Sequence, residues 1–186
     1  MTYSFLVKYG EIVGIPVLCE KTGRIVGRTE DIIFSCESME VVALAIKNID
    51  FLSKKNVIRT ADIKSIGRDA VVVGEDCRKS LKELGIHRSI IKKGEQLLSK
   101  KVYTADGRNI GFVNDMLFNC EIGRIEGFEI SNGLVEDLIS GRNIIPIIGN
   151  CMIGNEGIFI SRESGEEIIN DGKGIVNLLK AKDEHS

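Results

Sequence analysis

The sequence has 186 residues, of which 43% are hydrophobic and 28% charged, and this ordinary balance predicts a globular protein. A formal net charge of −2 gives no electrostatic footprint for nucleic acid, and no apolar run is long enough to cross a bilayer. Five widely spaced cysteines without a CxxC motif favour free thiols, so we expect a cytoplasmic location.

Short runs rich in Val and Ile dominate the first half of the chain. Each is bounded by Gly, Asp, Asn or Ser, which is typical of strands. The expected strands are 12–18, 25–27 leading into 30–34, 40–46, 57–59 and 70–73. A helical turn is expected at 61–67. Lys79 to Leu84, followed by Gly85, predicts a short helix with a glycine stop.

The second half of the chain repeats this series. The expected strands are 96–102, 110–113, 116–118, 124–130, 144–148 and 157–160, with a short terminal helix at 175–182. The block 22–37 returns as 106–121 with its Gly, Arg, Gly, Asp, Phe, Cys and Glu residues in the same places. The blocks 57–63 and 67–73 return as 144–150 and 154–160, with an insertion within 132–143. Two copies of one small domain are therefore predicted, with function on a duplicated binding surface.

This repeat gives the expected domain organisation. Residues 1–75 form copy one, 76–93 a linker with the short helix, 94–165 copy two, and 166–186 a partly helical tail. The regular spacing of short strands predicts a mainly β fold, made of two tandem small antiparallel barrels with helical turns in the linker and the tail.

One residue pattern in both copies resembles a known family. It runs from a strand and G-x-P-V, through two spaced glycines, an Asp and a Phe, to a closing apolar strand. The residues that carry it are Gly14, Pro16, Gly23, Gly27, Asp31, Phe34, Gly107, Gly111, Asp115, Phe118 and Pro146. The pattern resembles the PRC-barrel, the small β-barrel of the photosynthetic reaction-centre H subunit and of the C-terminal domain of the ribosome maturation factor RimM. Two copies in tandem resemble the soluble tandem PRC-barrel proteins of Gram-positive bacteria.

Copy two departs from this pattern at its start. It has 97–100 (Leu-Leu-Ser-Lys) where copy one has 14–17 (Gly-Ile-Pro-Val). The pattern consists mostly of glycines and apolar residues, so it specifies a fold and carries no chemistry.

The repeated Gly and Asp residues are interpreted as structural. A strand, and no helix, follows Gly23 and Gly27, so these glycines predict turns and close backbone approach, not phosphate loops. Asp31 and Asp115 lie in separate copies. We interpret each as a side-chain cap of the preceding turn and not as one catalytic pair.

The dipeptides Cys36-Glu37 and Cys120-Glu121 recur where a hairpin turn is expected. Two cysteines and two glutamates can form a four-ligand metal or redox site if a pseudo-twofold axis brings them together. Small residues at the start of a hairpin are the simpler interpretation, and no His lies nearby. We therefore expect no cofactor and no metal, and keep a metal or redox sensor as an alternative.

No catalytic constellation is recognisable, so we expect no enzymatic activity. The leading hypothesis is a non-enzymatic cytoplasmic adaptor that binds a protein partner through strand edges or apolar faces. The alternative is a ribosome- or RNA-associated factor, suggested by the resemblance to RimM and by the basic pairs 54–55, 92–93 and 100–101. Seven Phe, three Tyr and no Trp count against an aromatic stacking platform. Strand edges can also pair between chains to form a homodimer.

Overall fold

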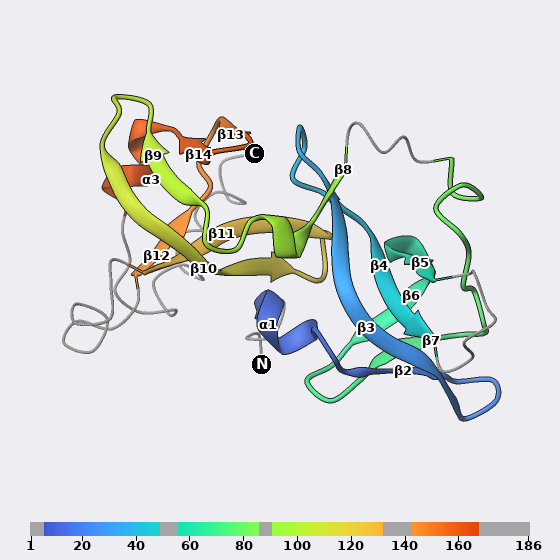
Figure 1. Cartoon of the computed structure of the whole chain (residues 1–186). Coiled ribbons are helices and arrows are strands. Elements are labelled where there is room, and N and C mark those ends of the chain that lie inside the picture. The colour runs from blue at the N-terminus through green and yellow to red at the C-terminus, as the bar shows by residue number, and fades with distance from the viewer. Residues whose placement is uncertain (1–5, 49–55, 86–90, 132–142, 168–186) are drawn as a thin grey trace. The chain divides into compact units, whose positions relative to one another are not determined.

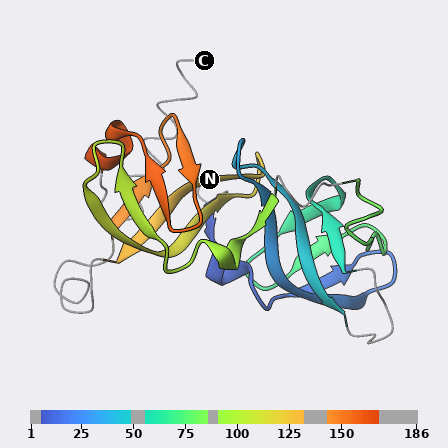
Figure 2. The same cartoon turned by 45° about the horizontal axis from the view of Figure 1, so that its top comes forward.

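The computed structural model describes residues 6–48, 56–85, 91–131 and 143–167 (Figure 1). Most of them lie in strands or in the turns that join strands, so the predicted mainly β class is confirmed. The strands form two seven-stranded sheets. Each sheet curls into a half-barrel, as the turned view in Figure 2 shows.

The first sheet is built from the first half of the chain. Its strand order is β5-β4-β3-β2-β7-β6. The bounds are β2 Pro16–Cys19, β3 Arg24–Ser35, β4 Val41–Asn48, β5 Val57–Arg59, β6 Ile63–Ile66 and β7 Val71–Val73. These strands pair antiparallel except β2 and β7, which are parallel. The sheet is therefore not wholly antiparallel, because β7 returns alongside β2 after β6.

The second sheet repeats this arrangement strand for strand. Its order is β12-β11-β10-β9-β14-β13. The bounds are β9 Lys101–Thr104, β10 Asn109–Asn119, β11 Arg124–Ser131, β12 Asn143–Pro146, β13 Cys151–Ile153 and β14 Gly157–Ile160. Again one pair is parallel, here β9 with β14. The two halves of the sequence thus share one sheet topology.

The two compact units of the chain are interleaved in sequence. One unit comprises Val7–Gln96 and Asn119–Arg124, and the other comprises Met1–Leu6, Leu97–Phe118 and Ile125–Ser186. Two further strands complete the sheets. β8 (Ile91–Lys93), within the expected linker, pairs with β3, and β1 (Leu6–Lys8) pairs with β10.

The hairpin tip between β10 and β11 also belongs to the first of these units. The N–H of Val41 donates to the carbonyl of Gly123 at 2.7 Å, and Glu40 forms a β-bridge with Arg124. The end of the β3–β4 hairpin that carries the turn is therefore flanked on both edges, by β8 beside β3 and by residues 123–124 beside β4.

Helical structure is limited to single turns in the described residues. These are α1 (Tyr9–Ile12), η1 (Thr60–Asp62), η2 (Gly94–Gln96) and α3 (Arg162–Glu166). Two strands consequently begin later than predicted: α1 delays β2 to Pro16, and η2 delays β9 to Lys101. The turn expected at 61–67 ends at Asp62, where β6 follows. The expected helix at 175–182 and most of the insertion lie outside the described residues.

The short helix predicted at Lys79 to Leu84 is a turn. The N–H of Lys79 donates to the carbonyl of Val57 on β5, and the carbonyl of Lys79 accepts from the N–H of Val57. The start of the segment therefore pairs with the edge of the sheet. One helical bond remains, from the N–H of Leu84 to Ser80, before Gly85 adopts a φ of 65°. This part of the prediction was wrong because pairing with the sheet edge outweighed local helix propensity.

Each sheet encloses its own apolar side chains. Phe34 on β3 and Phe118 on β10 are both fully buried, at matching places in the repeat. The other large side chains that are fully buried include Ile32, Leu44, Ile46, Ile58, Met116, Ile125, Phe128 and Ile130. Burial of this apolar surface is the main stabilising contribution to either unit.

Backbone hydrogen bonds align the starts of the two copies differently from the sequence. The N–H of Gly14 donates to Thr29 at 2.8 Å, and the N–H of Ser99 donates to Val113, the counterpart of Thr29, at 2.8 Å. Gly14 and Ser99 also share a left-handed φ, 89° and 64°. Ser99, and not Leu97, therefore occupies the position of Gly14.

Candidate functional site

A row of large apolar side chains crosses the outer face of the second sheet. Met152 on β13 lies directly opposite Phe159 on β14, and Phe159 lies beside Tyr103 on β9. The rings of Phe159 and Tyr103 stack, with centroids 5.6 Å apart and planes inclined by 25°. Met152 is 62% exposed and Phe159 41%, so the row faces outwards. The low aromatic content did not predict this arrangement, because placement and not number creates it.

The ring of Tyr103 lies over Gly157 of the neighbouring strand. A Cβ atom at Gly157 would lie 3.2 Å from Cε2 and 3.4 Å from Cδ2 of Tyr103. The ring therefore covers the glycine on the neighbouring strand, an arrangement that shields bare backbone. A ring held in this way loses little conformational entropy when a ligand contacts it.

Lys101 and Phe112 extend the row. Lys101 on β9 lies opposite Phe112 on β10 and beside Gly157 on β14. Lys101 is two residues from Tyr103, so both side chains leave the same face of the strand. Phe112 is 42% exposed. We call the surface formed by Lys101, Tyr103, Phe112, Met152 and Phe159 the aromatic face.

The first sheet provides an internal comparison for the aromatic face. In the register of the first sheet, Leu18 pairs with Val72, Ser65 with Val72, and Pro16 with Arg28. These residues correspond to the members of the aromatic face as follows: Leu18 to Tyr103, Val72 to Phe159, Ser65 to Met152, Pro16 to Lys101 and Arg28 to Phe112. None of these counterparts is aromatic or a methionine. Since both sheets have the same topology, the fold does not require aromatic or methionine side chains at these positions.

Asp31 lies in the middle of β3, beside a β-bulge, and is only 1% exposed. Its Oδ1 accepts hydrogen bonds from the N–H of Ile32 at 2.8 Å and of Glu95 at 3.3 Å. Its Oδ2 is enclosed without a partner of hydrogen-bonding geometry among the described residues. The interpretation of Asp31 as a turn cap is thus wrong: the carboxylate binds the η2 turn, which is remote in sequence.

Close packing around Asp31 depends on Gly94. A Cβ atom at Gly94 would lie 2.6 Å from Cε2 of Tyr9, 2.7 Å from Cγ1 of Ile32 and 3.0 Å from Oδ1 of Asp31. Burial raises the pKa of the Asp31 carboxyl group above its usual value. The hydroxyl of Tyr9 and the amides of Ile32 and Glu95 act in the opposite direction, whereas the charge of Glu95 raises it.

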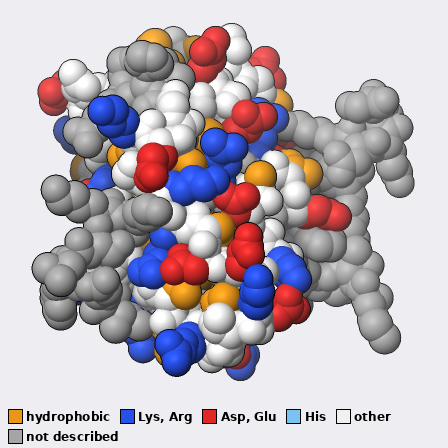
Figure 3. All heavy atoms as spheres, turned by 90° about the vertical axis from the view of Figure 1, so that its right-hand side faces the viewer, with side chains coloured by type: hydrophobic (Ala, Val, Ile, Leu, Met, Phe, Trp, Pro, Cys, Tyr) orange, Lys and Arg blue, Asp and Glu red, His pale blue; other side chains and the backbone are white. Residues whose placement is uncertain are grey.

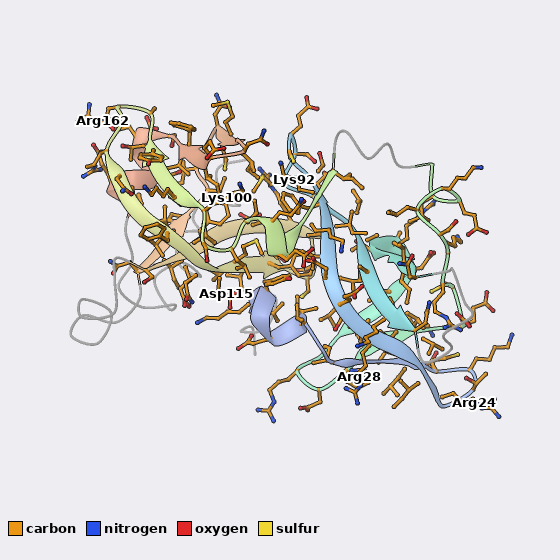
Figure 4. The ribbon with its side chains drawn as sticks, viewed as in Figure 1. Arg24, Arg28, Lys92, Lys100, Asp115 and Arg162 are labelled. Carbon is orange, nitrogen blue, oxygen red and sulfur yellow. The ribbon has the colours of Figure 1, made fainter. Side chains whose placement is uncertain are left out.

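Asp115 occupies the matching place on β10 (Figure 4). Its Oδ1 accepts a hydrogen bond from the N–H of Met116 at 2.7 Å, as Asp31 does from Ile32. Asp115 is half-buried, however, so the two copies give this carboxylate different surroundings.

The repeated glycines have two different roles. Gly23 and Gly107 adopt φ values of 66° and 86° with no atom near an added Cβ, so the turn conformation selects glycine. Gly27 permits close approach, since its Cβ would lie 2.9 Å from the carbonyl oxygen of Lys47. Pro146 ends β12 and Pro16 begins β2, where a missing N–H is tolerated.

The paired Cys-Glu turns show no sign of a metal site. Cys36 and Cys120 are free thiols, and Glu37 and Glu121 are exposed. Burial raises the pKa of Cys36, partly offset by Lys92, and raises that of Cys120 to about 12. Across the described ranges, no three His, Cys, Asp or Glu side chains form a group that could hold a metal ion.

Basic side chains do not gather into one patch on the face of the molecule that Figure 3 shows. The face in Figure 3 carries Lys and Arg interspersed with Asp and Glu. Arg24 begins β3, whereas Lys92 lies beside Phe34 near the other end of that strand (Figure 4). Arg28 and Lys100 donate to backbone carbonyls, those of Gly14 and Asn155. Lys54 and Lys55 lie outside the described residues.

Comparison with known proteins places the aromatic face in a known domain. Residues 91–166 match the PRC-barrel domain, so the chain contains one such domain, which spans β8 to α3. The chain is also 27% identical over 136 residues, 73% of its length and 75% of the relative's, to the Uncharacterized protein YrrD of Bacillus subtilis (strain 168). In the described ranges, no helix is long and apolar enough to cross a membrane.

Proposed function

We propose that this chain is a non-enzymatic protein-binding module made of two PRC-barrels, which docks a protein partner on the aromatic face. The observation that carries the proposal is the difference between the two sheets. They share one topology, but among the described residues the exposed aromatic and methionine side chains lie on the sheet of the PRC-barrel domain. Large exposed apolar surfaces on soluble proteins usually mark interaction sites. Aromatic residues also dominate binding energy at interfaces.

The assignment of copy one as a second PRC-barrel rests on two observations. Its strand order matches that of copy two, including the parallel pair. Its Gly23, Gly27, Asp31 and Phe34 recur in the matched domain as Gly107, Gly111, Asp115 and Phe118. Free cysteines support a cytoplasmic location. A homodimer formed through strand edges stays a prediction.

A non-catalytic role is supported by the state of the titratable groups. Asp31 is enclosed by packed side chains, and burial raises the pKa of the Cys36, Cys77 and Cys120 thiols, which disfavours the nucleophilic thiolate. The pKa of Cys19 is lowered, first by a hydrogen bond with Thr22 and not by a neighbouring base.

Affinity capture from a lysate of the native host, with and without ribonuclease, tests this proposal. The wild-type chain is compared with a Met152→Ser, Phe159→Ser double variant and with Ile25→Ser, a control that removes a 44% exposed apolar side chain from the first sheet. A protein that survives ribonuclease and is lost only with the double variant is expected. Equal capture by all three chains would place the binding surface elsewhere.

An RNA-associated role is the second candidate function. The stacked Tyr103–Phe159 pair beside Lys101 favours it, because bases stack on exposed aromatic rings and a cation contacts the phosphate. The net charge of −2 and the mixed charges on the face that Figure 3 shows oppose it. Salt-sensitive binding of single-stranded RNA, abolished by the Met152→Ser, Phe159→Ser variant, would move this candidate to first place.

A further inference from the structure

We propose that the aromatic face binds an extended partner segment in which a large apolar side chain and a carboxylate lie two residues apart. This inference rests on the proposed protein-binding function and adds the chemistry of the partner. It follows from the apolar row, from the charge of Lys101, and from the spacing between the two.

The apolar half of the site is the surface formed by Tyr103, Phe159 and Met152. The rings of Tyr103 and Phe159 are stacked, and the ring of Tyr103 lies over Gly157. Together they offer an ordered contact surface. Met152, 62% exposed at the end of the row, has a flexible and polarisable side chain that adapts to different shapes. An aromatic or aliphatic side chain of the partner fits this surface better than a polar one.

The charged half of the site is Lys101. The ion pairs of the described residues do not include it, whereas its neighbour Lys100 is occupied with the carbonyl of Asn155. In the first sheet, Pro16 stands at this place in the register, so the fold has no need of a cation here. A cation between Phe112 and Gly157, at the border of an apolar surface, is complementary to a carboxylate.

The distance between the two halves sets the spacing in the partner. Lys101 and Tyr103 are alternate residues of β9 and leave its outer face about 7 Å apart. Alternate side chains of an extended peptide have the same separation and direction. A segment lying along β9 therefore brings residue i to the rings and residue i+2 or i−2 to the ammonium group.

Selection of phage-displayed random dodecapeptides on the full-length chain tests the inference. Enriched peptides are expected to carry Phe, Tyr, Trp, Leu or Met two residues from Asp or Glu. A synthetic copy of an enriched peptide should bind about ten-fold or more weakly to Phe159→Ser and to Lys101→Glu, the loss typical of a central contact. Binding to Ile25→Ser should equal binding to the wild-type chain. Unchanged circular dichroism of each variant shows that it is folded.

A second selection on Lys101→Glu gives the sharpest control. If the carboxylate contacts Lys101, the enriched peptides should exchange Asp or Glu for Lys or Arg and keep their apolar residue. Enriched peptides that bind wild type and all variants equally would overturn the inference while leaving protein binding at another surface. Failure to enrich peptides would also overturn the inference, and the lysate capture then decides separately between a folded partner and RNA.

Discussion

The N–H of Glu95 donates a hydrogen bond to Oδ1 of Asp31, 3.3 Å away and 64 residues earlier in the chain. Glu95 belongs to η2, close to the start of the region that matches the PRC-barrel domain, and Asp31 belongs to β3 of the first sheet. The first segment of the matched domain is thus built into the unit formed by copy one. The repeats in the sequence and the compact units in the structure do not have the same boundaries.

Separation of the chain in the linker should therefore damage copy one. A fragment of residues 1–90 lacks β8 and residues 119–124. At the turn of the β3–β4 hairpin, β3 and β4 then both lose their outer pairing partners. Bare strand edges promote aggregation. We expect this fragment to aggregate or to lack a cooperative thermal transition, as measured by circular dichroism. A monomeric fragment with the melting temperature of the full chain would contradict the interleaved organisation.

Asp31→Asn should raise the free energy of unfolding at neutral pH. Because burial raises the folded-state pKa, the folded state binds more protons than the unfolded state between the two pKa values. The free energy of unfolding therefore falls as pH rises through that window. The destabilisation by the ionised, buried carboxylate is complete above the folded-state pKa. Asn keeps an acceptor for the amides of Ile32 and Glu95 without this cost. The gain should shrink as pH falls through the folded-state pKa.

Asp31→Ala is the control for that experiment. It removes the charge together with the acceptor, and leaves buried N–H donors unsatisfied, at a cost of about 1–3 kcal/mol for each buried group. Urea unfolding at several pH values measures both variants. Equal stability of the Asn and Ala variants would show that the hydrogen bonds of Asp31 contribute nothing.

Gly94→Ala should destabilise the chain. Its Cβ would overlap Tyr9, Ile32 and Asp31 at 2.6–3.0 Å, and overpacking of this kind costs about 1–3 kcal/mol. Gly67→Ala is the matched control, because its Cβ would meet only the carbonyl of Ala70, at 3.4 Å. Urea unfolding of both variants checks the prediction. A Gly94→Ala variant as stable as the control would mean that η2 is not packed against β3 as described.

Ser99→Gly should stabilise the chain, and Gly14→Ser should destabilise it. Both positions have a left-handed φ, which costs a residue other than glycine about 1–2 kcal/mol. Part of the gain at Ser99 is lost because glycine is more flexible in the unfolded chain, so a net effect of about 0.5–1 kcal/mol is expected. Thermal unfolding measures both changes, and effects of the same sign would refute the equivalence of the two positions.

The sequence was sufficient to predict the β class and several strands, because these depend on local periodicity and turn residues. The strands at 57–59 and 157–160 have the predicted bounds. The sequence did not predict the pairing of Lys79 with Val57, which replaced a helix, or the exchange of β8, because both depend on contacts remote in sequence.

The candidate site was harder to predict than the fold. Met152, Phe159 and Tyr103 come from three strands, and only the register brings them into one row. An available signal was the difference between the copies: Phe159 and Phe112 stand where copy one has Val72 and Arg28. Large apolar residues that one repeat has and the other lacks indicate surface function and not a need of the fold.

The most direct test of protein binding at the aromatic face is site-specific photo-crosslinking in the native host. A photoreactive p-benzoylphenylalanine replaces Phe159 in one strain and Ile25, exposed on the first sheet, in another. We expect irradiation to join one discrete protein to the chain at position 159 and not at position 25. No crosslinked protein at 159, or the same protein from both positions, would contradict the account.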